Sequence, residues 1–243
     1  MKIKTTRHKL LLTTTICVAA VSLASCASMP QTPEEAHQMR SEKIAEIIRR
    51  AENKAGLSRS LKTLEKRYKS NSENEIAATE YAYALRKEGM LTRAQTILEP
   101  FAKSKDTSAP TKTEYAKVLL EQGKTKESES YAQQAVLADD KYDRAYHVLG
   151  VALDAQGMHE EAERAFRKGL ELWEGDPTTI MNNLALNLAS QNQLEEASEI
   201  LYKAQALSPE RVEIERNIRI INALKQSQGI PVPKPRSKPS IKE

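Results

Sequence analysis

Few side chains in this sequence have the types and spacing that chemistry requires. Three histidines follow residue 26, namely His37, His147 and His159, and the last two fall on different predicted helices. No cysteine or carboxylate pair in the sequence accompanies them at the spacing of zinc ligands. The GKT sequence at 123–125 resembles the end of a phosphate-binding loop, but Val118 replaces the first glycine of that loop and no strand is predicted before it. We therefore expect no enzymatic activity, no metal site and no cofactor.

The thiol of Cys26 has a predicted reaction of its own. Residues 1–25 begin with basic side chains and continue with an apolar stretch at 10–23 that is too short and too rich in threonine for a membrane span. This stretch ends in the sequence LASC at 23–26, which resembles the bacterial lipobox. In that motif the cysteine is diacylated through its thiol and becomes the first residue of the mature protein. An ordinary secretory signal peptide with an incidental cysteine is the alternative.

The lipobox resemblance also implies a location. Ala27 follows the cysteine where lipoproteins that stay in the inner membrane have an aspartate. The resemblance therefore implies a protein that is anchored to the outer membrane by its lipid alone and faces the periplasm, with residues 26–33 as a tether. Because Cys17 would be removed with the signal peptide, the mature chain could form no internal disulfide.

The charge of the sequence gives no reason to expect nucleic-acid binding. The sequence has 37 lysines and arginines against 33 aspartates and glutamates, and the signal peptide holds four of the basic residues and none of the acidic ones. The positive and negative charges of the mature chain are therefore equal in number, and the formal charge of +4 belongs to the leader. The proline-rich segment 227–243 is basic, and we expect a disordered tail there. This tail could meet an acidic partner or an anionic surface, or it could be a solvated terminus.

A 34-residue period organises the rest of the sequence. Gly89, Gly123 and Gly157 lie 34 residues apart, and Asn192 takes the same place in a fourth copy that follows one extra residue. A tight turn between helices requires a positive φ, which glycine adopts freely and asparagine tolerates. A small residue stands five positions after each turn residue. These small residues are Ala94, Ser128, Ala162 and Ala197.

Thirty-four residues is the length of a tetratricopeptide repeat (TPR), a unit of two antiparallel helices. The sequence therefore predicts an all-α TPR solenoid, which is a right-handed superhelix of antiparallel helix pairs. The predicted units are 75–108, 109–142, 143–177 and 178–211. Residues 34–74 are predicted to form an N-terminal helical pair or degenerate repeat. A capping helix is predicted at 212–226, with one apolar side formed by Val212, Ile214, Ile218, Ile221 and Leu224.

The first helices of TPR units line a concave groove, and this groove is the candidate binding surface. In the predicted register its lining has mixed charge and an aromatic ring, which suits an extended peptide or a helix of a partner protein. Three of the lining side chains, Tyr83, Arg86 and Arg144, turn away from the stacking positions, so we expect the core not to need them. A solvated inner face without a ligand is the alternative. The predicted lining residues are Tyr83, Arg86, Lys117, Arg144, His147, Asp154, Thr179 and Asn182.

Several segments together resemble one group of TPR lipoproteins. They are HVLGVALDAQGMHEEA at 147–162, NNLAL at 182–186, LEEA at 194–197, and the closing RV and RNI at 211–212 and 216–218. Over roughly residues 75–224 the chain resembles the TadD family of tight-adherence (Flp) pilus assembly lipoproteins. The resemblance implies an outer-membrane scaffold for protein–protein interaction in assembly of the pilus secretion apparatus, with a secretin or another pilus component as partner. It implies no catalysis and assigns no individual binding residues.

Two other functions fit the same sequence. One is a pilotin-like lipoprotein for the secretin of another pilus or secretion system. The other is an envelope scaffold that recruits cell-wall enzymes or other assembly factors. Neighbouring genes for a pilus ATPase, a secretin and a prepilin peptidase would favour the tight-adherence function. Loss of wall-hydrolase recruitment without a pilus defect would favour the envelope scaffold.

Overall fold

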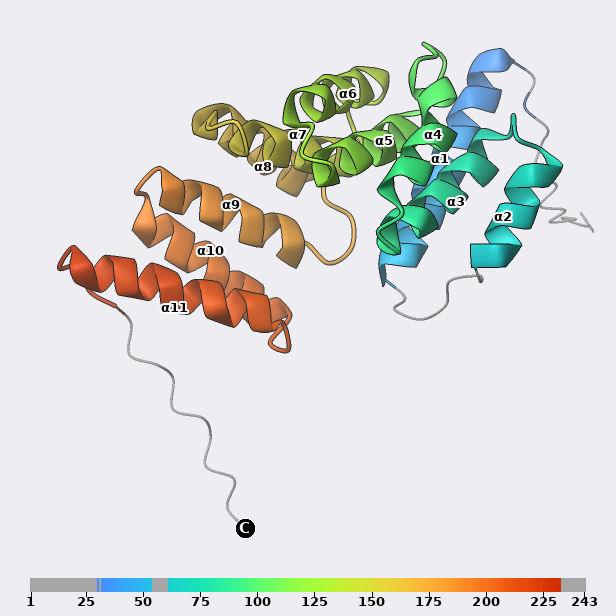
Figure 1. Cartoon of the computed structure of the whole chain (residues 1–243). Helices are drawn as coiled ribbons and strands as arrows, with labels where there is room; N and C mark the ends of the chain where they lie inside the picture. Colours follow the sequence, from blue (N-terminus) through green and yellow to red (C-terminus); the bar gives the residue numbers. More distant parts are fainter. Residues whose placement is uncertain (1–29, 31, 54–60, 233–243) are drawn as a thin grey trace, which may run out of the picture.

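The computed structural model describes residue 30, residues 32–53 and residues 61–232 of the chain. All regular structure in these residues is helical, and each repeat helix packs against the next one along the chain (Figure 1). The predicted all-α TPR solenoid is thus confirmed. The predicted signal peptide, Cys26 and residues 233–243 of the predicted tail lie outside the described residues. None of the described helices combines the length and the apolar character that a membrane span requires.

Four consecutive helix pairs form the solenoid. They are α3 (Glu75–Lys87) with α4 (Leu91–Ala102), α5 (Ala109–Glu121) with α6 (Thr125–Ala138), α7 (Asp143–Asp154) with α8 (His159–Leu172), and α9 (Thr178–Ser190) with α10 (Leu194–Leu207). The first helix of each pair also contacts the first helix of the next pair, as α3 does with α5 and α7 with α9. The first helices therefore share one side of the stack, where they line the groove.

The four turns within these pairs share one backbone geometry. The φ angle is +73° at Gly89, +77° at Gly123, +78° at Gly157 and +61° at Asn192. In each turn, the amide of the next residue donates a hydrogen bond to the carbonyl of the leucine four positions before the turn residue. This bond satisfies a carbonyl that the helix end would leave free. The repeated turn residue thus sets a repeated change of direction.

Close approach of paired helices depends on the small residues of the first helices. Ala82, Ala116 and Ala185 are fully buried, and Gly150 takes the same place in α7. A Cβ atom on Gly150 would lie 2.6 Å from the ring of Phe166, which is itself 1% exposed. The aromatic ring of α8 therefore occupies the space that the glycine of α7 leaves open.

The helix α2 (Leu61–Ser70) packs on the first repeat and extends its core. Leu64 is buried there, and the ring of Tyr68 lies 5.8 Å from that of Tyr81, measured between centroids. Leu64, Tyr68 and Tyr81 belong to an apolar cluster that continues through α3, α4 and α5. A second cluster joins α7 to α10 and the last helix. The solenoid thus has apolar cores toward both ends.

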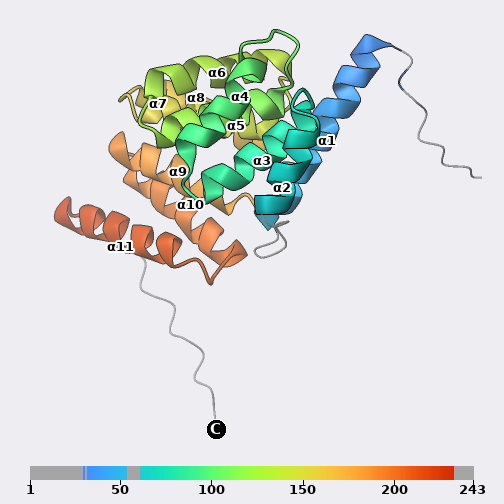
Figure 2. The same ribbon diagram turned by 45° about the vertical axis from the view of Figure 1, so that its right-hand side comes forward.

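The helix α1 (Pro33–Asn53) makes its main contacts with α3 and α5, and the N-terminal helical pair or degenerate repeat over 34–74 stays a prediction. It begins with reciprocal caps, because the Glu35 amide donates to Thr32 Oγ1 at 3.1 Å and the Thr32 amide donates to the Glu35 carboxylate. It then packs across α3 and α5. Figure 2 shows α1 alongside the stack, with its N-terminal end projecting beyond the repeats. Ile44 and Ile48 of α1 are buried in this contact.

The helix α11 (Val212–Ser227) caps the solenoid by packing mainly on α10. Ile214, Ile218 and Ile221 are buried in this contact. Val212 is 70% exposed and Leu224 is 42% exposed, so these two do not belong to the packed side that the sequence predicted. The helical periodicity of α11 turns them away from α10.

Candidate protein-binding groove

A hollow of about 850 Å³ lies on the first-helix side of the stack. It extends from the last turn of α1 across α3, α5 and α7 to α9 and Arg211 at the start of α11. We call this hollow the groove. Six of the eight predicted groove residues line it: Tyr83, Arg86, Lys117, Arg144, His147 and Thr179. Asp154 and Asn182 do not.

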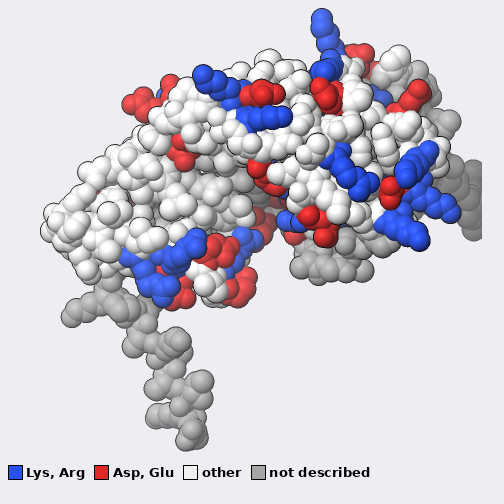
Figure 3. Space-filling model, viewed as in Figure 1, with Lys and Arg blue, Asp and Glu red and all other residues white. Residues whose placement is uncertain are grey.

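Charged side chains are distributed unevenly over the molecule. On the face that Figure 3 shows, lysine, arginine, aspartate and glutamate are interspersed over α3, α4 and α11, and few charges lie over α9 and α10. The sequence of α9 contains no charged residue. The charges that line the groove come instead from α1, α3, α5 and α7 and from the segment around Asp176 and Arg211. The groove thus has charged side chains at the end that α1 adjoins and at the end formed by Asp176 and Arg211, and a neutral polar wall on α9.

Arg86 of α3 joins the first two repeats. Its Nε donates to Glu114 Oε1 at 2.5 Å and its Nη1 donates to Glu121 Oε1 at 2.6 Å. Its guanidinium also lies over the ring of Tyr83, 5.4 Å from the centroid. Burial would lower the pKa of Arg86, but the two glutamates outweigh burial and raise it. Arg86 is therefore an inter-repeat ion pair, which corrects the expectation that the core does not need it.

Arg144 at the start of α7 is also a structural residue, and only 3% of it is exposed. Its Nη1 donates to both carboxylate oxygens of Asp143, at 2.9 and 2.7 Å, and its Nε donates to Glu52 at 2.8 Å. The guanidinium lies 4.9 Å from the ring centroid of Trp173. The expectation that the core does not need this arginine is wrong, because the adjacent Asp143 and the more distant Glu52 and Trp173 enclose its guanidinium.

Glu52 in the last turn of α1 is the groove residue that the repeat pattern could not reveal. Its carboxylate accepts hydrogen bonds from Lys117 Nζ at 3.2 Å and from Arg144 Nε at 2.8 Å. Burial alone would raise the pKa of Glu52, but the charges of Lys117 and Arg144 outweigh it and lower the pKa to about 2. The carboxylate is thus fixed as an anion between two cations of the groove.

His147 forms part of the groove wall as a neutral ring. Asn183 Nδ2 donates to its Nε2 at 2.8 Å, and Trp173 contacts it edge to face with centroids 5.7 Å apart. Burial, with smaller contributions from Lys117 and Arg144, lowers the pKa of His147 to about 3. The described residues contain no group of three or more potential metal ligands. The histidine therefore contributes shape and one hydrogen bond to the wall.

The other three predicted groove residues make contacts within the stack. Asp154 Oδ1 accepts a hydrogen bond from Asn187 of the next repeat at 2.7 Å and lies 2.8 Å from His159 Nδ1. Asn182 Oδ1 accepts from Asn217 of α11 at 2.7 Å. Thr179 Oγ1 accepts from Arg211 at 3.0 Å, at the far end of the groove. Asp154 thus joins two successive repeats, Asn182 joins the last repeat to the capping helix α11, and neither residue lines the groove.

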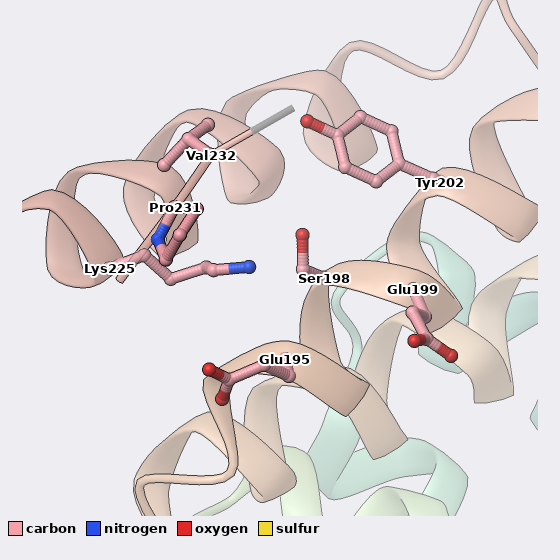
Figure 4. A pocket seen from close by; sticks show the side chains of 7 residues that line it. All are labelled: Glu195, Ser198, Glu199, Tyr202, Lys225, Pro231 and Val232. Atoms are coloured by element: carbon pink, nitrogen blue, oxygen red, sulfur yellow. The ribbon is translucent and has the colours of Figure 1, made fainter. Parts of the chain in front are cut away.

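A smaller hollow lies between α10 and α11 (Figure 4). Lys225 is 5% exposed, and Figure 4 shows its side chain directed toward Ser198 of α10, with Glu195 nearby. Pro231 and Val232 form one wall. Because the chain itself closes this side, the hollow marks the place where the segment after α11 folds back onto the cap.

Comparisons with known proteins agree with this fold. Residues 143–172 and 178–207 each match a sequence profile described as tetratricopeptide repeat. A TPR protein of Thermus thermophilus superposes with a TM-score of 0.60 at 16% identity, over 77% of this chain and 99% of the other. YrrB, described as a TPR protein with an unusual peptide-binding site, gives 0.52 at 19% identity, over 76% and 89%. PilF of Pseudomonas aeruginosa gives 0.55 at 16% identity, over 63% and 69%.

No curated protein sequence shows significant similarity to the chain. At these identities the solved structures establish the fold alone. The chain therefore has the TPR fold and contains two sequence-matched repeats, and its function has to be argued from its own residues.

Proposed function

We propose that this chain is a scaffold for protein–protein interaction that binds a segment of a partner protein in the groove. The observation that carries the proposal is the groove itself, which is lined by side chains from α1, from all four repeats and from the start of α11. It combines the rings of Tyr83 and Trp173 with ordered cations and a neutral polar wall. Aromatic rings and arginines are the residues that most often anchor protein interfaces.

We further propose that the chain works as an outer-membrane lipoprotein in assembly of a tight-adherence (Flp) pilus secretion apparatus. The support is the LASC sequence at 23–26 and the resemblance of residues 75–224 to the TadD family. The expected partner is a secretin or another pilus-assembly component. PilF of Pseudomonas aeruginosa supports this only through its similar fold. A pilotin-like role at another secretin and an envelope scaffold for cell-wall enzymes remain the alternative functions.

Two exposed lysines provide a matched test of the groove. Lys87 lines the groove at the end of α3, whereas Lys126 is exposed on α6, a second helix that does not line it. The double variant Tyr83→Ala with Lys87→Glu alters the groove and removes the ring contact of Arg86, but it leaves the carboxylate partners of Arg86 and Arg144 in place. We expect it to retain the melting temperature and envelope abundance of the wild type to within a few degrees and to lose most partner capture in crosslinked envelopes.

The control for this experiment is Lys126→Glu, which makes the same charge change outside the groove. It should capture partners at the wild-type level. Mass spectrometry of the crosslinked proteins separates the three functions. A secretin of the tight-adherence pilus, the secretin of another system or a cell-wall hydrolase would be the most abundant captured protein in the respective cases. Unchanged capture by the stable groove variant would exclude the groove as the binding surface.

A further inference from the structure

Four residues of α1 face the stack at intervals of four positions. They are Arg40, Ile44, Ile48 and Glu52. Ile44 is 1% exposed and Ile48 is 2% exposed, although α1 as a whole is polar and largely exposed. Residues four apart lie on one face of a helix, so these four form a single stripe along α1. A second row one position further along also contacts the repeats: Ser41 is buried, Ala45 packs on the apolar cluster around Tyr142, and Arg49 forms an ion pair with Glu174 at 2.8 Å.

The two ends of the stripe are charged, and each meets an opposite charge on the repeats. Arg40 Nε lies 2.9 Å from Glu75 Oε2, although its N–H is not aligned for a hydrogen bond, and Arg40 Nη2 donates to the Asp106 carbonyl at 3.4 Å. Glu52 at the other end binds Lys117 and Arg144. The surface under α1 is thus complementary to a helix that carries a basic residue, two aliphatic residues and an acidic residue at intervals of four positions.

This surface consists of first helices, which are the helices that line the groove. The helix α1 packs on α3 and α5, and Glu52 reaches Lys117 of α5 and Arg144 of α7. Among the described residues, Glu52 is the only ion-pair partner of Lys117. Without Glu52, this partly buried ammonium group would lack a counter-ion, and a carboxylate from another molecule would be attracted to the same place.

We propose that α1 is the chain's own occupant of a helix-binding surface, and that the partner segment is an amphipathic helix of the same chemistry which replaces α1. The partner helix carries a base, two aliphatic residues and an acid at successive intervals of four positions. This inference rests on the proposed scaffold function and specifies the class of partner that the same side of the solenoid binds. Helix-in-groove recognition reads anchors with this helical spacing.

The probe that tests this proposal is a synthetic peptide of residues 33–53 with blocked termini. Its affinity is measured by fluorescence anisotropy for the full mature chain with Cys26→Ser, and for the same chain with Ile44→Ser and Ile48→Ser. The second chain holds its own α1 less tightly. We expect it to bind the peptide at least about tenfold more tightly than the first, because an intramolecular competitor is weakened.

Two peptide variants test the chemistry of recognition. Glu52→Gln in the peptide should weaken binding about tenfold, because it removes a carboxylate that accepts two charge-assisted hydrogen bonds. Glu46→Gln makes the same change on the outward face, where Glu46 pairs, within the part of the chain that the structure describes, with Arg50 of α1 itself. That control peptide should bind as the unmodified peptide does. Equal loss with both variants would overturn the proposed specificity.

If the chain with Ile44→Ser and Ile48→Ser does not fold, hydrogen exchange of the wild-type chain tests the same proposal. In the wild-type chain, amides of residues 40–52 should exchange faster than those of α7, and excess peptide should increase their exchange further. Protection of α1 equal to that of α7, without any response to the peptide, would overturn the proposal and make α1 an integral helix. Dimers that exchange α1 between chains, seen by light scattering, would overturn it in favour of a second copy as occupant.

The outcomes for this inference and for the scaffold function differ. If envelope proteins are captured and the peptide does not displace them, the proposed preference for a helix like α1 is overturned and the scaffold function stands. Peptide binding without any captured envelope protein would overturn the scaffold function and leave the helix-binding surface in place.

Discussion

At the scale of single residues, the arginines of the groove combine two roles. Arg144 borders the hollow, yet Asp143, Glu52 and Trp173 enclose its guanidinium. Asp143 is 4% exposed and also accepts the amide of Glu174 at 3.0 Å. A side chain with this many partners holds the groove in shape. The residues available to a ligand are therefore the more exposed ones, such as Lys87.

Arg144→Ala should destabilise the fold strongly. The substitution leaves the buried carboxylate of Asp143 without its counter-ion, which typically costs about 3–5 kcal/mol. The free energy of unfolding is measured by urea titration followed by circular dichroism. Lys87→Ala, a change at an exposed groove residue, should alter that free energy by no more than about 0.5 kcal/mol. Similar values for the two variants would contradict the structural role of Arg144.

Glu52 makes the docking of α1 sensitive to acid. Its pKa in the folded chain is about 2, below the ordinary value of 4.5, so its contribution is complete above pH 4.5 and is lost as the pH falls toward 2. The charged groups that face it are Lys117 of α5 and Arg144 of α7, and the nearby Tyr83 stays neutral because its pKa is raised to about 12. The side chain of His147 becomes charged only near pH 3.

The single tryptophan, Trp173, reports this change because Arg144 lies over its ring. We expect its fluorescence to change between about pH 4.5 and 2 in the wild-type chain. Glu52→Gln should already show part of the low-pH signal at neutral pH and should keep only the change that accompanies protonation of His147, which contacts Trp173. The neutral ring of His147 contributes a separate loss of stability as the pH falls from 6.5 toward 3, and that loss should persist in the variant. Identical titrations of both chains would argue against the Glu52 contact.

At the scale of helices, the pairing of α7 with α8 depends on one missing methyl group. The space beside Gly150 is filled by the ring of Phe166, and both residues are buried. The same position is alanine in the other three repeats, namely Ala82, Ala116 and Ala185. In the third repeat the first helix thus has a smaller side chain, and the aromatic ring of the second helix fills the space, so the helix spacing is kept.

Gly150→Ala should therefore destabilise the chain, even though alanine favours helices. The new Cβ would lie 2.6 Å from the Phe166 ring, and overpacking of this kind costs about 1–3 kcal/mol. Combining it with Phe166→Leu should cost less than the sum of the two single changes, because the smaller side chain relieves the clash. Thermal unfolding of the four chains gives this comparison. Ser130→Ala, on the exposed face of α6, should be neutral or slightly stabilising. Additive effects at 150 and 166 would show that the two side chains do not share this space.

At the scale of the whole molecule, α1 links three repeats that would otherwise meet only their neighbours. Arg40 contacts Glu75 of α3, and Glu52 contacts both Lys117 of α5 and Arg144 of α7. A repeat array normally holds together through contacts between adjacent units. The helix adds contacts along the stack, and its removal would therefore loosen the first three repeats together.

Attachment to the membrane is predicted to depend on one atom, the sulfur of Cys26. Cys26→Ser should abolish incorporation of radiolabelled fatty acid, because the lipobox thiol is the site of acylation. Cys17→Ser is the matched control, since that residue would be removed with the signal peptide. It should leave labelling unchanged. Labelled fatty acid in the Cys26 variant would show that the chain is not a lipoprotein of this type.

Much of the fold could be predicted from the sequence because its determinants are local. A turn at positive φ selects glycine or asparagine, and close helix packing selects alanine or glycine, so the 34-residue period specifies the helix pairs. The same period indicated which side of the stack would line a groove. The lipid anchor, the outer-membrane location and the role in pilus assembly remain predictions from resemblance.

The tertiary structure alone decided where α1 lies and which groove charges are already paired. Glu52 meets Lys117 and Arg144 across 65 and 92 residues, and no repeat column contains it. An ion pair requires only that two opposite charges come together in space, so sequence spacing carries no signal of it. The sequence thus determined the repeating scaffold, whereas its three-dimensional packing determined the occupant of the helix-binding surface.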